Sequence, residues 1–179
     1  MYFLAIVAPE TINQQLLKWK LWMKEHYNCE VALRSPAHIT LVPPFWMKPE
    51  LETDLLYSIN EFSKTEISFH VHLKDFSNFK PRVIYIDVLQ NDHLNSLKNK
   101  LLTFLLVKNK FPIVSDDHSF YPHVTIATRD LHKKAFYEAW EYFKEKNYEA
   151  DWSVNGISLL RHNKKNWDVF HTSQFQKIA

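Results

Sequence analysis

The chain has 179 residues, of which 46% are hydrophobic, and a formal net charge of +2. This length is typical of one compact domain, so we expect residues 1–179 to form a single domain with a substantial core. The small net charge gives no electrostatic basis for tight, non-specific nucleic-acid binding. The chain has one glycine, Gly156, which excludes a glycine-rich phosphate loop. Any bound phosphate must therefore be held by side chains or by other backbone amides.

In chain order, we first predict a strand over 2–8, a helix over 10–27 and a loop over 28–37. A second strand starts at His38 and ends at Pro43-Pro44, because proline has no donor for the strand ladder. A helix around 51–62, a hairpin of strands 67–76 and 82–89, a helix capped by Asp92 and a polar connector over 108–119 follow. A strand that starts at His123, a helix around 136–143 and two or three strands over 148–175, with a turn near 162–166, complete the chain. This order indicates two similar α+β halves.

The compartment is indicated by the cysteine content and by the N-terminal segment. The sole cysteine, Cys29, cannot form an internal disulfide, which is typical of a reducing compartment; we expect it to be a packed thiol. The N-terminal segment lacks a basic leader, and no apolar run approaches 18 residues. We therefore predict a cytoplasmic monomer with no membrane partner.

A His-x-Thr pattern occurs twice, 85 residues apart, as His38-Ile39-Thr40-Leu41 and His123-Val124-Thr125-Ile126. Side chains of a strand alternate between its two faces. In each copy the His and the Thr therefore share one face, and the aliphatic residues share the other.

Two imidazoles and two hydroxyls that face one groove suit the chemistry of a phosphodiester. One His can activate an attacking water while the other protonates the leaving oxygen, and the hydroxyls can bind the non-bridging oxygens. In-line attack needs the two His on opposite sides of phosphorus, so we expect their reactive nitrogens to lie roughly 5–8 Å apart.

Segments 37–45 and 121–129, which carry the two motifs, and the opening segment 3–9 resemble the 2H phosphoesterases. This family includes RNA 2′,3′-cyclic phosphodiesterases and so-called 2′-5′ RNA ligases. The element order also matches, so the resemblance covers nearly the whole chain. It implies a bilobal, pseudo-twofold α+β fold in which antiparallel sheets surround a central groove and helices lie outside.

The resemblance also implies a function and the residues that perform it. His38 and His123 would be the acid/base pair and Thr40 and Thr125 the phosphate binders, without a metal or a cofactor. The substrate would be a nucleotide or an RNA end with a cyclic phosphate, 2′,3′-cyclic or related. The chain departs from many relatives in two places: Pro43-Pro44-Phe45-Trp46 replaces a glycine after the first motif, and Thr128 intervenes before Arg129, where relatives carry a basic residue.

Further substrate contacts are predicted near the motifs, with Tyr121 and Arg129 as the main candidates. Aromatic side chains could stack on a base, namely Tyr121, Phe120, Phe45 and Trp46, although aromatic residues also build cores. Basic side chains could contact a terminal phosphate, namely Arg34, Arg129, Lys80 and Arg82, although solvated surface charge is the alternative. A carboxylate such as Asp87 could orient a catalytic imidazole.

Other polar groups are assigned no role in the chemistry. We expect His70 and His72, on one strand face, and the cluster Asp116-Asp117-His118 to be solvated, and the remaining His residues to be structural: His26, His93, His132, His162 and His171. Two alternatives to hydrolysis remain open. One is a nucleotide- or RNA-binding module without turnover, and the other is 2′-5′ RNA end-joining, the reverse of the same phosphoryl chemistry.

Overall fold

The structure is a computed structural model that describes residues 1–109, 111–113 and 119–176. Its strands are β1 (Tyr2–Val7), β2 (His38–Phe45), β3 (Phe69–Phe79), β4 (Val83–Val88), β5 (His123–Ala127), β6 (Glu149–Val154), β7 (Gly156–His162) and β8 (Trp167–Gln174). Its α-helices are α1 (Glu10–Tyr27), α2 (Glu52–Ser63), α3 (Asp92–Thr103) and α4 (Lys133–Phe143). The described residues contain no helix that is both long enough and apolar enough to cross a membrane.

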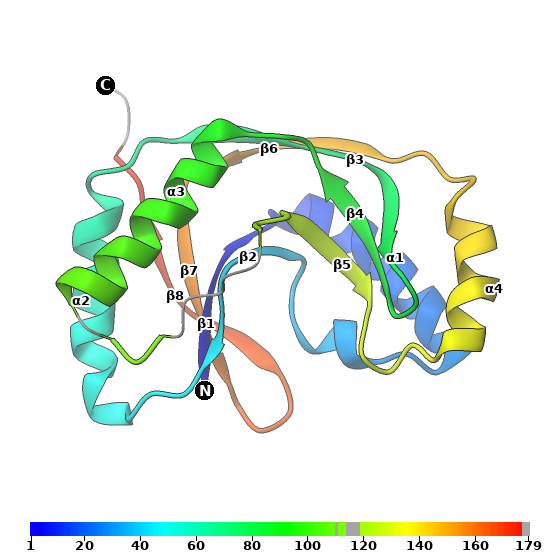
Figure 1. Cartoon of the computed structure of the whole chain (residues 1–179), viewed down its shortest axis with the longest axis horizontal. Helices are drawn as coiled ribbons and strands as arrows, with labels where there is room; N and C mark the ends of the chain where they lie inside the picture. The colour runs from blue at the N-terminus through cyan, green and yellow to red at the C-terminus, as the bar shows by residue number, and fades with distance from the viewer. Residues whose placement is uncertain (110, 114–118, 177–179) are drawn as a thin grey trace.

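These strands form one curved antiparallel sheet in the order β6-β3-β4-β5-β2-β1-β7-β8, shown in Figure 1. The expected pair of sheets is therefore two four-stranded halves of one sheet, which meet where Ile39 of β2 pairs with Val124 of β5. Helices α1 and α4 pack against β5 and β4 of one half, and α2 and α3 pack against β8, β7 and β2 of the other. The two strands that carry the motifs are thus neighbours at the centre of the sheet.

Burial of apolar faces explains why these segments adopt these elements. In β2 and β5, Ile39, Leu41, Val124 and Ile126 are fully buried in the core, whereas the His and Thr residues between them stay partly exposed. Helix α1 buries Ile12, Leu16 and Met23 at helical spacing. The predicted alternation of the motif strands is therefore confirmed.

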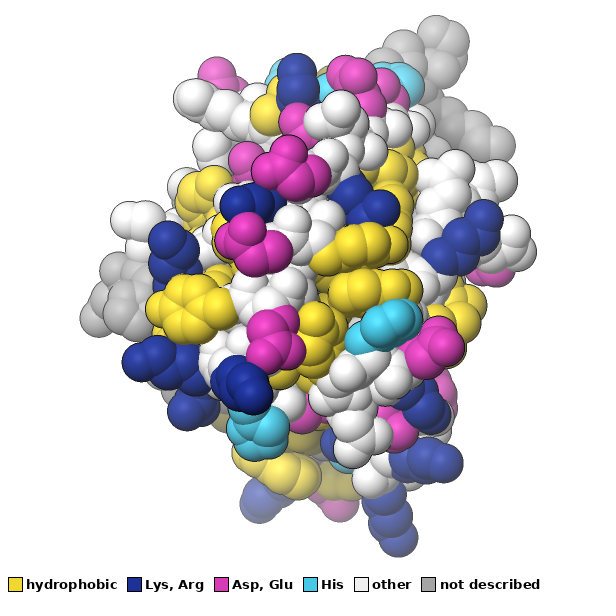
Figure 2. Space-filling view, turned by 90° about the vertical axis from the view of Figure 1, so that its right-hand side faces the viewer, with side chains coloured by type: hydrophobic (Ala, Val, Ile, Leu, Met, Phe, Trp, Pro, Cys, Tyr) yellow, Lys and Arg dark blue, Asp and Glu magenta, His cyan; other side chains and the backbone are white. Residues whose placement is uncertain are grey.

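Aromatic side chains fix α1 against α4 on the outside of the molecule. Figure 2 shows this face, on which hydrophobic side chains lie among charged ones. Trp22 stacks on Tyr142 with ring centroids 4.0 Å apart, His26 stacks on the other side of Trp22 at 4.2 Å, and the Lys146 ammonium lies 4.0 Å from the Tyr142 ring centre. These aromatic residues stabilise the helix pair.

The structure corrects two predicted boundaries. Strand β2 continues through Pro43 and Pro44 to Phe45. The β1–β2 register shifts between Tyr2 and Leu4 at this point, and both prolines are exposed, so the strand tolerates them. Helix α3 is capped by Asn91 rather than Asp92, since the Asn91 side chain accepts a hydrogen bond from the Leu94 amide at 3.0 Å.

The predicted hairpin exists, but its first strand extends to Phe79. Asp75 has a φ of 55° and interrupts the β3–β4 register between Lys74 and Phe76. This irregularity breaks the alternation on which the shorter prediction depended.

Gly156 begins β7, where it pairs with Gln174 of β8. A Cβ atom at this position would lie 2.4 Å from the Ser173 carbonyl oxygen and 3.2 Å from its carbon. The strands approach too closely here for any side chain, so the sole glycine of the chain is required by packing.

Candidate active site

The β2–β5 pairing brings the two motifs together. Because Ile39 pairs with Val124 in an antiparallel ladder, His38 lies beside Thr125, and Thr40 lies beside His123, on the same face. His38 and His123 are therefore diagonal neighbours, a relation that separates cross-strand residues by about 7–8 Å. Both histidines are partly buried and partly exposed.

The two imidazoles have matching hydrogen bonds. His38 Nδ1 donates to the Pro36 carbonyl oxygen at 2.7 Å, and His123 Nδ1 donates to the Tyr121 carbonyl oxygen, also at 2.7 Å. A carbonyl can only accept, so the Nδ1 atom of each ring carries the proton. Within the described ranges no hydrogen bond to Nε2 of either ring is found, so this nitrogen can accept or donate a proton.

The surroundings of the two rings differ in charge. The pKa of His38 is lowered to about 4, mainly by burial; the hydrogen bond to Pro36 opposes this effect, and the Lys20 and His123 charges add to it. Burial also lowers the pKa of His123, but the hydrogen bond to Tyr121 and the Asp87 carboxylate oppose this effect. Asp87 of β4 is the cross-strand partner of His123. His123 is therefore the imidazole with a carboxylate to stabilise its protonated form.

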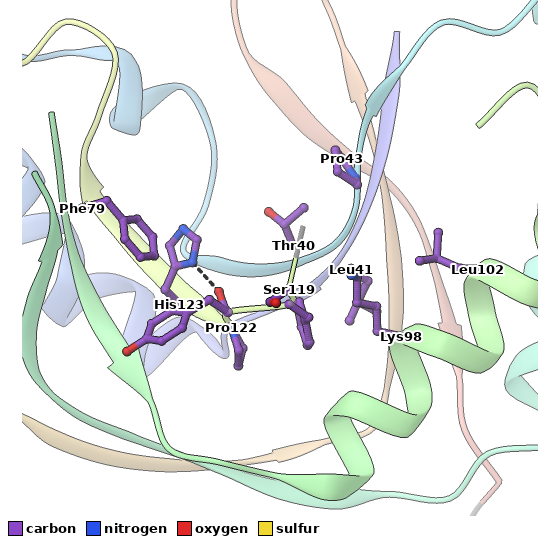
Figure 3. Close-up of a pocket in the computed structure, with 11 residues that line it drawn as sticks. Thr40, Leu41, Pro43, Phe79, Lys98, Leu102, Ser119, Pro122 and His123 are labelled. Carbon is purple, nitrogen blue, oxygen red and sulfur yellow. Dashed lines mark hydrogen bonds between the residues drawn. The ribbon is translucent and has the colours of Figure 1, made fainter. Parts of the chain in front are cut away.

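One cavity, of about 350 Å³, lies on the His123 side of the motifs. We call it the aromatic chamber, and its lining includes Phe79, Phe120, Tyr121, Leu41, Leu102, Thr40 and His123. Phe79 and Tyr85 contact the His123 ring, with centroids 5.2 and 5.0 Å away. In Figure 3, Thr40 and His123 project into this cavity from adjacent strands, and a dashed line marks the Nδ1 hydrogen bond. The chamber thus combines aromatic side chains with the His123 imidazole.

A second cavity, of about 460 Å³, lies on the His38 side. We call it the basic chamber, and its lining includes Lys20, Arg34, His38, Thr40, Thr125, Arg129 and His162. Thr40 lines both chambers. Among the described residues, no Asp or Glu lines the basic chamber. Its electrostatic character favours an anionic ligand.

The match to known proteins agrees with this arrangement. Residues 8–166 match the family model described as the 2′-5′ RNA ligase superfamily. The chain belongs to this superfamily. A Bacillus pumilus (strain SAFR-032) protein named "Putative phosphoesterase" is 25% identical over 152 residues, which cover 83% of this chain and 84% of that protein.

Two solved structures show the superfamily fold. The structure of E. coli LigT complexed with 3′-AMP has a TM-score of 0.70 and 18% identity, and the match covers 98% of each chain. The structure of TT0787 of Thermus thermophilus has a TM-score of 0.68 and 19% identity, and the match covers 97% of each chain. These matches confirm the α+β fold predicted from the element order and the family resemblance.

Of the aromatic and basic residues predicted as further substrate contacts, some line the chambers and others do not. Tyr121 and Phe120 line the aromatic chamber, and Arg34 and Arg129 line the basic chamber. Phe45 is instead buried in the core, and Trp46, 76% exposed, lines a separate hollow beside Pro112. Lys80 and Arg82 lie at the β3–β4 turn, outside the lining of both chambers.

The polar groups to which the sequence analysis assigns no role in the chemistry have mostly structural roles. Burial and the Asp130 charge raise the pKa of Cys29 to about 11, so this thiol is a poor nucleophile. His72 contacts Asp151 and Glu149, at 2.7 and 2.9 Å, on the outer strands of its half. Asp116-Asp117-His118 lies outside the described residues.

Sequence reasoning missed two residues of the basic chamber, Lys20 and His162. Lys20 occupies the buried stripe of α1, four residues after Leu16, and is only 4% exposed. A lysine at an apolar position of an amphipathic helix was the available signal. No local pattern in the sequence distinguishes His162, because its position beside the chamber depends on the pairing of β7 with β1 and β8.

Asp130 supports the wall of the basic chamber. Its Oδ2 atom accepts hydrogen bonds from the Glu30 and Val31 amides, at 2.6 and 2.9 Å. These amides begin the short 3-10 helix Val31–Arg34, which carries Arg34. The carboxylate thus fixes a chamber wall that the sequence predicts only as a loop.

Proposed function

We propose that this protein is a metal-independent phosphodiesterase that hydrolyses a cyclic phosphate, 2′,3′-cyclic or related, of a nucleotide or an RNA end. The observation that carries the proposal is the diagonal placement of His38 and His123 on one face, with Thr40 and Thr125 between them and both Nε2 atoms free. A phosphorus atom between the two rings would meet a base on one side, an acid on the other and two hydroxyl donors.

The charges around the two rings support an assignment of roles. His38 has its pKa lowered to about 4 by burial, with Lys20 beside it, and is therefore neutral and suited to act as the base. His123 faces Asp87 and is suited to hold the proton of the acid. In hydrolysis, His38 Nε2 takes a proton from water as the water oxygen bonds to phosphorus. The ring P–O bond breaks, and its oxygen takes the proton of His123 Nε2, which yields a phosphomonoester.

The aromatic chamber supports a nucleotide as substrate. Phe79, Phe120 and Tyr121 line this chamber together with His123, and aromatic side chains can stack on any nucleobase. LigT, which shares the fold, has been solved with 3′-AMP, a compound of the class that hydrolysis of a 2′,3′-cyclic nucleotide would produce. Tyr121 and Arg129 are proposed as substrate contacts, one in each chamber.

The test is turnover of 2′,3′-cyclic AMP by the wild type, His38→Ala and His123→Ala. Removal of either acid/base group should lower kcat by about 10²- to 10⁴-fold. His70→Ala, on the exposed side of β3, is the matched control and should keep full activity. Unchanged activity of both motif variants would refute the assignment. A wild type that binds 3′-AMP but turns over no cyclic phosphate would instead identify a binding module, and joining of RNA ends without hydrolysis would identify a ligase.

A further inference from the structure

Lys20 is a buried cation in the wall of the basic chamber. Its side chain is 4% exposed, and Nζ donates a hydrogen bond to the Ser35 carbonyl oxygen at 3.1 Å. An ammonium has three donors, so two N–H groups remain for another acceptor. Burial lowers the pKa of Lys20 to about 8, so the side chain is still mainly protonated at neutral pH.

This cation has no anionic partner among the residues that the structure describes. The charged and titratable groups that line the basic chamber with it come from five other parts of the fold: Met1 with its amino group, Arg34 of the 3-10 helix, His38 of β2, Arg129 after β5 and His162 of β7. Within the part of the chain that the structure describes, no salt bridge involves Lys20. Burying an unpaired charge is unfavourable, which suggests that the chamber is built for an anion from outside.

The basic chamber has more room than the proposed reaction uses. The phosphorus would lie near Thr40, which lines both chambers, and the nucleoside would occupy the aromatic chamber. The attacking water needs about 30 Å³, whereas the basic chamber has a volume of about 460 Å³. Lys20, Arg34 and Arg129 around this space could hold a second phosphate group.

We propose that the substrate is a nucleotide with a second phosphate group besides the cyclic one, and that Lys20 binds this second phosphate in the basic chamber. This inference rests on the proposed function and specifies its substrate class. Lys20 Nζ donates to a phosphoryl oxygen while it keeps its bond to Ser35, and the exposed Arg129 and Arg34 side chains contact the same group from the chamber mouth.

The experiment compares binding of two nucleotides that differ by one phosphate. Calorimetric titration with 3′-AMP and with adenosine 3′,5′-bisphosphate measures how much the second phosphate increases the binding affinity. Neither compound is turned over in this experiment. Three proteins are compared: the wild type, Lys20→Met, which keeps the length of the side chain but removes the ammonium, and Lys18→Met, the control on the exposed face of α1. Arg34→Met is a second variant that removes a cation of the same chamber from an exposed position.

The wild type and Lys18→Met should bind the bisphosphate at least about tenfold more tightly than 3′-AMP. This factor corresponds to the free energy of one charge-assisted hydrogen bond. Lys20→Met should lose most of this preference, and Arg34→Met should lose a smaller part. The wild-type preference should also decrease above pH 8, where Lys20 loses its proton. A structural role of Lys20 would change neither the preference nor its pH dependence.

The inference is overturned if the wild type does not prefer the bisphosphate, or if Lys20→Met keeps the preference. These results are independent of the proposed function, which is tested by hydrolysis of 2′,3′-cyclic AMP. If the protein hydrolyses this compound but has no preference for a second phosphate, the proposed function is supported and only the inferred substrate class is wrong. A preference without hydrolysis of any cyclic phosphate would contradict both, because the second phosphate is inferred for a substrate of that reaction.

Discussion

Asp87 on β4 lies directly across from His123 on β5. Burial lowers the pKa of His123, and the Asp87 carboxylate, together with the hydrogen bond to the Tyr121 carbonyl, raises it. His38 lies beside Lys20 instead, whose charge adds to the effect of burial and lowers the pKa of that imidazole. The two imidazoles thus have different proton affinities, because the pKa of His38 is lowered to about 4, mainly by burial, whereas at His123 the Asp87 carboxylate opposes the effect of burial.

This difference predicts an acidic optimum for kcat/KM, which reports the ionisation of the free enzyme. Activity should rise as the pH increases through about 4, where His38 loses its proton. It should fall as the pH increases through the pKa of His123, which lies below its ordinary value of 6.5. In Asp87→Asn this upper limb should move to lower pH, because the carboxylate no longer favours the imidazolium.

The profile is measured with 2′,3′-cyclic AMP between pH 3.5 and 9. Asp54→Asn, on the exposed side of α2, is the control and should match the wild type. The activity of Asp87→Asn at pH 7 should therefore be lower than that of the wild type. Superimposable profiles of Asp87→Asn and the wild type would show that Asp87 does not act on the acid.

Acid stability should depend on His38. Its folded-state pKa of about 4 lies below the 6.5 of an unfolded chain, so the unfolded state binds the proton more readily between these values. This contribution to stability is complete above pH 6.5 and is lost as the pH falls toward 4, by at most about 3 kcal/mol. His38→Gln should show a weaker loss of unfolding free energy in this window in urea titrations. His70→Gln should follow the wild type, and an identical slope for His38→Gln would contradict the prediction.

Replacement of Lys20 by Met should stabilise the fold. Burial disfavours the charged form of Lys20 and lowers its pKa to about 8, so an apolar side chain of similar length should fit the α1 stripe better. A gain of about 1 kcal/mol would raise the melting temperature of a protein of this size by about 2–4 °C. Thermal unfolding at pH 7 without phosphate measures the effect, with Lys18→Met as the control. A lower melting temperature would mean that the bond to Ser35 outweighs the cost of the buried charge.

Gly156→Ala should destabilise the β7–β8 edge. The new Cβ would lie 2.4 Å from the Ser173 carbonyl oxygen, so the two strands would have to separate. Overpacking of this kind costs about 1–3 kcal/mol, and a loss of about 2 kcal/mol would lower the melting temperature by about 4–8 °C. Calorimetry measures this change, and Ser153→Ala on the outer strand β6 should have little effect. A melting temperature equal to that of the wild type would show that the strands adjust without cost.

Chelation of metal ions should leave hydrolysis unchanged. In the described parts of the chain, no group of three or more His, Cys, Asp or Glu side chains could hold a metal ion, and the proposed reaction needs only the two imidazoles and the hydroxyls. The rate with 2′,3′-cyclic AMP should be equal before and after dialysis against EDTA. A loss of activity that is restored by a divalent cation would contradict metal independence.

Local patterns predicted the motif strands and the amphipathic helices because burial imposes a regular spacing on apolar residues. Contacts between side chains of neighbouring strands depend on the strand order and on the pairing register, and local sequence patterns do not predict either of these. Asp87 meets His123 only because β4 is the neighbour of β5 and the β4–β5 register shifts between Ile84 and Tyr85. The same limit applies to His162, which reaches the basic chamber from a strand on the other side of β1. Lys20 was detectable in principle, since it interrupts an apolar stripe, but its partner Ser35 lies on a loop.

The protonated nitrogen of each imidazole is fixed by a backbone carbonyl, that of Pro36 or Tyr121, rather than by another side chain. Substitutions in the walls of either chamber therefore leave the tautomers of His38 and His123 unchanged. Such a chain can acquire new ligand preferences during evolution by replacing wall residues, while the reacting nitrogens keep their orientation. Residues that select the ligand and residues that move protons can thus diverge at different rates.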